Sequence, residues 1–390
     1  MNGAKLREYH FLRALAGNAE VSYLYFAEPG SQPLTTTDLP FCRQVLGVPK
    51  PLAYGYAKTA LGILGQTPLT VLNYSSAAMS AALLHMIHGA DFDVMHLDGV
   101  HMSRYASEAL KKKSSLKLIY NWHNIESEAL WRYSQTTTSR ARRWYARNTA
   151  TKLERVEKHN LESAFGHIVC SEREKAHLLQ LVPARRVEVV ENGVDIRHFA
   201  PGAEVSAPGR RIVFVGAMDY FPNTDAAIFF AHRIWPEVRG RLAGAELIIV
   251  GSNPGPAVLA LGELPGVKVT GMVPDVRPFY GQALAAVVPL RTGGGTRLKI
   301  LEAMAAGVPV VSTPLGAEGL DVTDGENVLL AGAEDVAGWV DRLVSLAESG
   351  DLRERLTAAG LRLVRSRYDW DTLGAKLCAT YERWLAETER

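Results

Sequence analysis

Residues 289–311 read PLRTGGGTRLKILEAMAAGVPVV, and this stretch decides the fold of the second half of the chain. An apolar strand pattern runs into three glycines, Gly293, Gly294 and Gly295, and a helical pattern follows over 296–306. Glycines let a phosphate approach the backbone closely, and a helix N-terminus offers free N–H groups with partial positive charge. The order strand, glycines, helix therefore predicts an anion site at this junction.

Charged side chains in the helix agree with that prediction. Arg297 and Lys299 lie in the first helical turn, where acidic residues are usually preferred. A bound diphosphate explains the two cations, and Glu302, one turn further along, is placed to accept hydrogen bonds from ribose hydroxyls. The alternative is a glycine turn followed by solvated charges. The segment is not a Walker A loop, because Ile300 follows the lysine.

The strands around this stretch are continuous apolar runs. They occupy 211–216, 245–251, 267–271, 283–290 and 308–313, with helical patterns between them. Strands of this kind are buried on both faces of a parallel sheet. The pattern predicts an α/β fold with a doubly wound sheet, whose ligands bind at the carboxyl ends of the strands.

The first half shows the same alternation, with strand patterns at 21–27, 92–97, 116–122 and 167–171. A segment rich in Pro, Gly and Ala, residues 198–210, is typical of a linker. A chain of 390 residues also favours two domains. We therefore expect one domain over 1–197, a second over 198–368, and a final helix over 369–390.

Composition narrows the class of protein. Apolar residues make up 47% and charged residues 22%, as in ordinary globular proteins, and a net charge of +2 argues against nucleic acid as a partner. The three cysteines, Cys42, Cys170 and Cys378, are odd in number and far apart, which fits a reducing compartment. No secretory signal or apolar run of about 18 residues is visible. We expect a cytoplasmic protein.

Two polar residues follow strand ends in the first half. His123 and Asp98 lie at the carboxyl ends of 116–122 and 92–97, where sites form in parallel sheets. A structural histidine remains the alternative for His123. Asp91 and Asp93 have the D-x-D spacing of metal-bound diphosphates, but they precede a strand, so no metal site is predicted. Glu126 is expected to cap the next helix.

Residues 140–158 form a basic helical pattern. The segment contains seven Lys and Arg but only two Glu, and Trp144 and Tyr145 lie among them in the sequence. Such a helix suits an anionic membrane surface, and the protein would then be peripheral on the inner face of the membrane. An ordinary solvated helix face is the alternative.

Five separated segments resemble the glycosyltransferase group 1 family, most closely the sugar transferases of exopolysaccharide clusters. They are residues 296–320, 189–201, 214–226, 123–128 and 169–174. The family comprises retaining enzymes of the GT-B fold. The resemblance implies two Rossmann-like domains facing across a cleft, an acceptor-side domain first and a nucleotide-sugar domain second. The C-terminal helix would cross back to the N-terminal domain.

The resemblance also assigns roles to individual residues. Arg297 and Lys299 would bind the donor diphosphate and, with His123 near the attacking hydroxyl, form the catalytic set. Donor-binding residues would be Gly216, Asn223, Gly294, Gly295, Thr296, Glu302, Gly316, Ala317 and Glu318. Asp98, Asn192 and Gly193 would line the cleft. No metal and no cofactor is implied beyond the nucleotide-sugar co-substrate.

Two features depart from the family pattern. The family usually carries a second glutamate eight positions before Glu302, where this chain has Gly294, so the donor sugar is not specified. The family also begins with an apolar strand and a glycine-rich loop, of which only Asn2 and Gly3 are recognisable. Either another segment fills the position of that strand, or the chain begins downstream of its natural start. The second explanation is favoured.

The resulting prediction is a retaining, metal-independent hexosyltransferase. It would move sugar from a nucleotide-diphosphate donor to a carbohydrate or lipid-linked carbohydrate acceptor in exopolysaccharide or envelope glycan synthesis. Two alternatives stay open: a nucleotide-sugar epimerase on the same fold, and a non-catalytic scaffold in a polysaccharide assembly complex. The sugar, base, acceptor and oligomeric state are not specified by the sequence.

Overall fold

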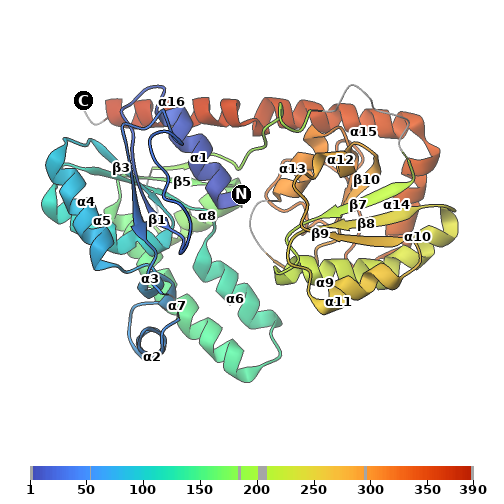
Figure 1. Cartoon of the computed structure of the whole chain (residues 1–390), viewed down its shortest axis with the longest axis horizontal. Helices are drawn as coiled ribbons and strands as arrows, with labels where there is room; N and C mark the ends of the chain where they lie inside the picture. Colours follow the sequence, from blue (N-terminus) through green and yellow to red (C-terminus); the bar gives the residue numbers. More distant parts are fainter. Residues whose placement is uncertain (1–2, 53, 183–185, 201–208, 294–296, 388–390) are drawn as a thin grey trace. The chain divides into compact units, whose positions relative to one another are not determined.

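A computed structural model describes residues 3–52, 54–182, 186–200, 209–293 and 297–387. The chain divides into two compact units (Figure 1). Unit 1 comprises Met1–Glu191 and Gly374–Arg390, and unit 2 comprises Asn192–Leu373.

Unit 2 contains one six-stranded sheet, in which every neighbouring pair is parallel. The strand order is β12-β11-β10-β7-β8-β9, so the chain reverses its direction of winding between β7 and β10. This is the order of a doubly wound dinucleotide-type sheet, and it confirms the predicted fold class. The strands are β7 (Arg211–Val215), β8 (Glu246–Val250), β9 (Val267–Gly271), β10 (Ala283–Val288), β11 (Val310–Ser312) and β12 (Leu329–Leu330).

Helices connect these strands and enclose the core of unit 2. All six residues of β10 are buried, as expected for an apolar strand covered on both faces. One helix continues through a π-helical turn, Phe230–Ile234, and Phe230 meets Trp339 edge to face at 5.5 Å. The helices are α9 (Phe221–Phe229), α10 (Trp235–Arg241), α11 (Pro256–Leu259), α12 (Arg277–Tyr280), α13 (Leu298–Ala305), α14 (Val336–Glu348) and α15 (Gly350–Leu363).

Unit 1 contains two parallel sheets. A four-stranded sheet has the order β3-β4-β5-β6, and β1 pairs with β2 in a separate sheet. The strands are β1 (Ser22–Ala27), β2 (Gln44–Pro49), β3 (Val94–Asp98), β4 (Lys117–Asn121), β5 (Gly166–Val169) and β6 (Val187–Val189). The helices are α1 (Gly3–Leu15), α2 (Tyr56–Leu64), α3 (Leu69–Asn73), α4 (Ala77–Gly89), α5 (Ser103–Lys112), α6 (Glu126–Thr136), α7 (Arg140–Ser163) and α8 (Glu172–Leu181).

The two sheets of unit 1 leave a strand position unfilled. Among the described residues, β1 is an edge strand of one sheet and β3 is an edge strand of the other. Residues of both strands line a cavity of about 1640 Å³. The apolar residues of β1 are only half-buried along its whole length, in contrast to β10. Among the described residues, no segment pairs with both β1 and β3.

The last helix, α16 (Trp370–Ala386), joins unit 1 from Gly374 onward. Its Trp384 lies so close to Gly166 that a Cβ there would be 2.4 Å from the indole ring. Lys376 forms an ion pair with the buried carboxylate of Glu191 at 3.0 Å. The C-terminal residues of the chain therefore belong to the same unit as its N-terminal sheets.

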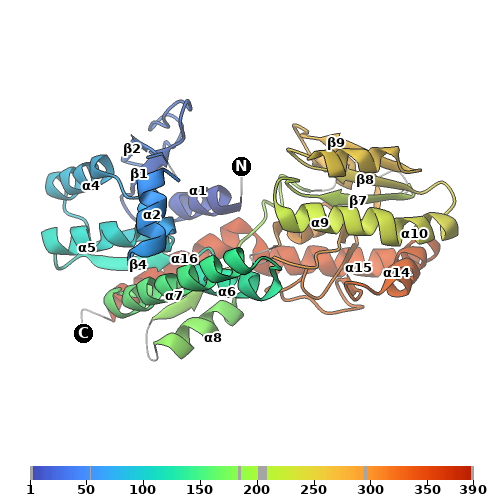
Figure 2. The same ribbon diagram turned by 90° about the horizontal axis from the view of Figure 1, so that it is seen from below.

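The start of α6 differs from the expected cap. The N-cap residue is Ile125, which makes no side-chain capping hydrogen bond, and Glu126 is instead the first residue of the helix. Glu157 of α7 takes that place, because its carboxylate accepts hydrogen bonds from the backbone N–H and the hydroxyl of Ser127. The expectation for Glu126 was wrong because the cap comes from a helix that packs beside α6 (Figure 2).

Candidate functional site

A half-buried lysine lies at the point of unit 2 where the sheet changes its direction of winding. Lys299, in the first turn of α13, donates a hydrogen bond from Nζ to Oδ1 of Asn223 at 2.6 Å. Asn223, at the start of α9, donates from Nδ2 to the carbonyl oxygen of Ala217 at 2.8 Å. The lysine Nζ also lies 4.9 Å from the ring centre of Phe214. The end of β7 and the start of α13 are thus joined through two side chains.

Gly216 makes this approach possible. A Cβ at this position would lie 2.8 Å from Nζ of Lys299 and 2.8 Å from Nδ2 of Asn223. Any side chain here would displace one of the two polar groups. The glycine is therefore required by close contact and not by backbone conformation.

The electrostatics of the cluster favour an anion. Burial and, second, the positive charge of Arg297 lower the pKa of Lys299 to about 7, while Glu302 opposes both. Arg297 is only 4% exposed, and its Nη2 donates to the carbonyl oxygen of Leu315 at 3.5 Å. A guanidinium keeps its charge at any ordinary pH. An anion bound here would restore the proton on the lysine.

Glu302 faces a residue that the sequence did not point to. Burial raises the pKa of Glu302, and Lys299 opposes the shift. The hydroxyl of Tyr280 donates to the carbonyl oxygen of Lys299 at 3.5 Å, and burial together with the charge of Glu302 raises the pKa of this phenol well above its usual value. No spacing rule connects Tyr280, on α12, with a helix that follows the next strand.

The loop after β11 is tightly folded at the same edge of the sheet. The N–H of Gly316 donates to Oγ1 of Thr313 at 2.8 Å, and the N–H of Ala317 donates to the carbonyl oxygen of Thr313 at 3.1 Å. A Cβ on Gly316 would lie 2.6 Å from the carbonyl oxygen of Val288. Glu318 follows, half-buried, at the end of this loop. Gly294, Gly295 and Thr296 lie outside the described residues.

Asn192 and Gly193 lie in a different part of unit 2. A Cβ on Gly193 would be 2.8 Å from side-chain atoms of Trp370 and Leu373 and from the carbonyl oxygen of Tyr368. The next residue, Val194, donates its N–H to the same Tyr368 oxygen at 2.8 Å. The described contacts of this turn are therefore with the segment that leads into α16, and they explain the glycine by packing.

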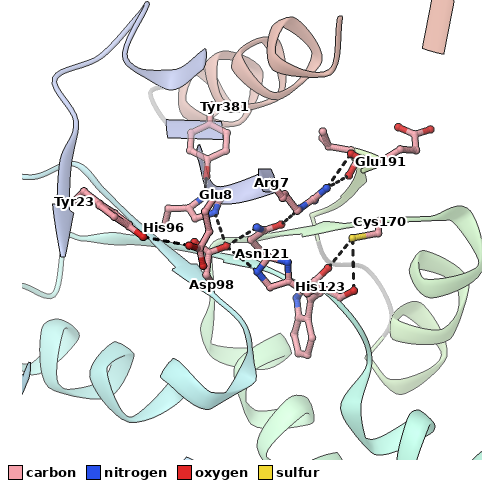
Figure 3. A network of polar contacts seen from close by, with 12 residues as sticks. Arg7, Glu8, Tyr23, His96, Asp98, Asn121, His123, Cys170, Glu191 and Tyr381 are labelled. Atoms are coloured by element: carbon pink, nitrogen blue, oxygen red, sulfur yellow. Dashed lines mark hydrogen bonds and ion pairs between the residues drawn. The ribbon is translucent and has the colours of Figure 1, made fainter. Parts of the chain in front are cut away.

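In unit 1, His123 and Asp98 come together at the carboxyl ends of β4 and β3 (Figure 3). Nε2 of His123 lies 3.3 Å from Oδ1 of Asp98. Asn121 donates to the same oxygen from Nδ2 at 2.6 Å, and the fully buried Arg7 donates from Nε to Oδ1 of Asn121 at 2.9 Å. A chain of polar contacts thus runs from α1 through β4 to the imidazole.

Arg7 is anchored at its other end by the chain after β6. Its Nη1 donates to the carbonyl oxygens of Val190 at 2.8 Å and Glu191 at 2.9 Å. The guanidinium also lies over the ring of Phe11 at 4.2 Å. No sequence pattern singles out this arginine, since one charged residue in an amphipathic helix is usually solvated.

The carboxylates of this network carry different charges near neutral pH. Burial tends to raise the pKa of Asp98, but His96 and His123 outweigh it and hold the pKa well below its usual range. Burial and then the charge of Asp98 raise the pKa of Glu8 to about 7. Tyr23 donates its hydroxyl to Oε2 of Glu8 at 3.2 Å. At neutral pH Asp98 is therefore ionised beside His123, whereas the Glu8 carboxyl group is partly protonated.

Three of these residues have the chemistry of cation ligands. One ligand atom from each of Glu8, Asp98 and His123 lies within 4.8 Å of the others. A carboxyl group whose pKa is about 7 must first lose a proton to bind a cation at neutral pH. Oδ1 of Asp98 already accepts the hydrogen bond from Asn121. These features make the group a poor fit for a resident divalent ion.

The comparison with known families covers both units. The model of Glycosyltransferase Family 4 matches residues 3–198, just over half of the chain, and the model of Glycosyl transferases group 1 matches residues 209–349. The chain therefore belongs to these glycosyltransferases.

Similar proteins include transferases that act on inositol lipids. A phosphatidyl-myo-inositol mannosyltransferase of Mycobacterium leprae is 26% identical over 80% of this chain and 78% of its own length. A GDP-mannose-dependent alpha-(1-6)-phosphatidylinositol monomannoside mannosyltransferase of Mycobacterium tuberculosis is 31% identical over 50% of this chain and 55% of its own length.

Solved structures agree on the fold. Sucrose-phosphate synthase from Thermosynechococcus elongatus superposes with a TM-score of 0.73 and 19% identity, over 98% of this chain and 93% of that one. Anabaena HepE in complex with UDP and glucose gives a TM-score of 0.69 and 16% identity, over 98% and 96%. The fold is GT-B, with two Rossmann-like domains, as the sequence predicted.

Proposed function

We propose that this glycosyltransferase moves a hexosyl group, with retention, from a nucleotide-diphosphate sugar to a hydroxyl acceptor. The observation that carries the proposal is the Gly216–Asn223–Lys299 cluster, with buried Arg297 beside it, at the carboxyl edge of a doubly wound sheet. A buried guanidinium and a half-buried ammonium side by side are suited to a diphosphate. The nucleotide complexes of HepE and the GDP-mannose-dependent relative support a nucleotide sugar as donor.

The proposed reaction needs little covalent chemistry from the protein. The bond between the anomeric carbon and the diphosphate oxygen breaks, and the acceptor oxygen attacks the same face of the sugar. The acceptor proton passes to a diphosphate oxygen. Lys299 and Arg297 stabilise the negative charge that grows on the leaving group, and such preorganised charge is usually the largest catalytic contribution. In this scheme Glu302 binds ribose, and the Gly316–Glu318 loop lies beside the donor sugar.

Unit 1 supplies the acceptor-side groups in this proposal. Asp98, ionised and fixed by Asn121, holds the His123 imidazole through Nε2 and leaves Nδ1 available to a sugar hydroxyl. The proposed acceptor is a carbohydrate or a lipid-linked carbohydrate of exopolysaccharide or envelope glycan synthesis, on the cytoplasmic side of a membrane. The inositol-lipid substrates named for the relatives support a lipid-linked acceptor.

The first test is donor binding and turnover. Thermal-shift measurements with nucleoside diphosphates and their sugars identify the base while the acceptor is still unknown. Slow hydrolysis of the matching nucleotide sugar, with retention at the anomeric carbon, is the expected activity. Failure of every nucleotide sugar to stabilise or to be hydrolysed would contradict the proposal.

Turnover is expected to be independent of divalent metal. Treatment with excess EDTA should leave the rate of donor hydrolysis within about twofold, because Lys299 and Arg297 perform the charge stabilisation that a metal ion performs elsewhere. Rates before chelation, after chelation, and after readdition of Mg²⁺ or Mn²⁺ check this. A loss restored by either ion would assign the charge stabilisation to a metal.

Donor binding is expected to weaken as pH rises above about 7. The pKa of Lys299 in the free protein is about 7, and the bound diphosphate must raise it. Affinity is then constant below the free-state value and falls by up to about tenfold per pH unit above it, until the bound-state pKa is reached. Isothermal titration in buffers of different ionisation enthalpy should show proton uptake at pH 8. Lys299→Arg, which stays charged, should bind with a flat pH profile; a flat profile in the wild type would contradict the assignment.

Gly216→Ala is expected to impair donor binding without unfolding unit 2. The new methyl group would displace Lys299 or Asn223 from their contact, so the dissociation constant should rise about tenfold or more. Gly240→Ala is the matched control, because a Cβ at that exposed position in α10 has nothing within 4 Å. Wild-type affinity in Gly216→Ala would remove the cluster from the donor site.

A further inference from the structure

The short helix α2 is apolar on the face that points to solvent. Tyr56 is 99% exposed, Leu61 60% and Leu64 84%, at spacings that place them along one side of the helix. The opposite side, which includes the buried Gly62, packs on the rest of unit 1. Surface helices usually bury their apolar stripe and expose their polar one. This helix does the reverse.

The orientation of α2 is fixed by specific contacts. Nζ of Lys152, a buried residue of α7, donates to the carbonyl oxygens of Gly62 at 2.9 Å and Ile63 at 2.7 Å. Nδ2 of Asn148 donates to the same Ile63 oxygen at 3.1 Å. A cation and an amide thus satisfy the C-terminal carbonyls of α2, which also suits the helix dipole. A Cβ on Gly62 would lie 2.9 Å from Cβ of Leu69, so α2 also sits directly on α3.

The residues just before α2 extend the same apolar surface. Tyr54 is 74% exposed and has a positive φ of 57°, a conformation that costs an aromatic residue energy. Its N–H donates to Oδ1 of Asn73 at 3.2 Å, which holds the backbone in place. Leu52 is also exposed. Tyr54 therefore presents its ring to solvent next to α2 although its backbone is strained.

Basic residues lie beside this surface on α7, which contacts α2. Figure 1 shows α2 and the α6–α7 hairpin on the same side of unit 1. Lys152 points inward and is not part of the exposed basic surface of this helix. Trp144 of α7 and Tyr133 of α6 are exposed near the hairpin turn. The exposed basic residues of the helix are Arg140, Arg142, Arg147, Arg155 and Lys158.

We propose that Leu52, Tyr54 and the outer face of α2, together with the exposed cations of α7, dock on an anionic lipid bilayer. Apolar side chains beside a basic helix, with aromatic residues between them, are the composition of interfacial membrane-binding helices. The cations attract anionic headgroups, and α2 enters the headgroup boundary. Among the described residues no helix is both long and apolar enough to cross a membrane.

The positive charge of this surface favours an anionic lipid bilayer over a second copy of the chain as its binding partner. A symmetric dimer formed through the same surface would bring the arginines of one α7 toward those of the other. Anionic lipid headgroups instead neutralise them. This inference does not depend on the donor site, because membrane binding is measured without any nucleotide sugar.

Flotation with vesicles tests the proposal. Wild-type protein is mixed with vesicles of 70:30 phosphatidylcholine and phosphatidylglycerol, in parallel with pure phosphatidylcholine, at low and high salt. We expect binding to the anionic vesicles only, reduced by salt. The double variant Leu61→Ser, Leu64→Ser and the double variant Arg142→Gln, Arg147→Gln should each lower the partition coefficient about tenfold or more.

The matched control is Leu259→Ser, Met272→Ser, which removes two exposed apolar residues from unit 2. It should bind vesicles as the wild type does, and all variants should keep the wild-type melting temperature. Absence of binding, equal binding to neutral vesicles, or an equal loss in the control would overturn the proposal. So would a dimer in solution that Leu61→Ser, Leu64→Ser dissociates, because the surface would then be a subunit interface.

Discussion

Replacing Lys299 by alanine is expected to lower kcat for sugar transfer by about 10²–10³-fold, the effect of removing one preorganised group that stabilises a transition state. The ammonium is held by Asn223 and the Phe214 ring at a fixed position, so water cannot reproduce its charge at the same point. Because the charge on the diphosphate grows as the bond to the sugar breaks, the loss should fall on kcat more than on KM.

The control for this variant is Lys268→Ala, which removes the same charge from an exposed position in β9. Steady-state rates of donor hydrolysis provide the measurement before an acceptor is known. A loss of less than tenfold in Lys299→Ala would exclude the lysine from the mechanism.

Replacing Arg7 by methionine is expected to destabilise unit 1 by about 3–5 kcal/mol, as removal of one member of a buried charged network typically does. The variant removes the hydrogen bonds that Arg7 donates to Oδ1 of Asn121 and to the carbonyl oxygens of Val190 and Glu191. For a unit of this size the melting temperature should fall by about 10 °C. Asn121 would also lose its orientation, so His123 and Asp98 should lose part of their function.

Differential scanning calorimetry is the measurement for Arg7→Met, because two units can give two transitions. Only the transition of unit 1 should move, and nucleotide binding by unit 2 should persist. Arg241→Met, at an exposed position in α10, is the control. A shift no larger than that of the control would show that the buried contacts of Arg7 contribute little.

The fold of unit 2 could be predicted because each of its buried strands is visible as a short apolar run in the sequence. Each apolar run of the second half became a strand of the sheet, with ends shifted by at most two residues: 211–216 became Arg211–Val215, 245–251 became Glu246–Val250, and 267–271 kept its bounds. Continuous burial on both faces leaves a pattern that one sequence displays by itself.

The donor cluster could be predicted only in part. Two cations after a glycine run mark the start of α13, but the bond from Lys299 to Asn223 joins residues 76 positions apart. The roles of Arg7 and Tyr280 could not be predicted from the sequence, because they arise from contacts between elements that are far apart along the chain. The outward orientation of the apolar face of α2 could not be predicted either, because it depends on the contacts of Lys152 and Asn148 of α7 and on packing against α3.

The measurement that bears most directly on the account is a crystal structure of the protein with its nucleoside diphosphate, grown in the presence of EDTA. The account predicts diphosphate oxygens about 3 Å from Nζ of Lys299 and from the guanidinium of Arg297, next to Gly216, with no metal between them. A diphosphate bound elsewhere, or the same two cations turned into bulk solvent in the complex, would contradict it.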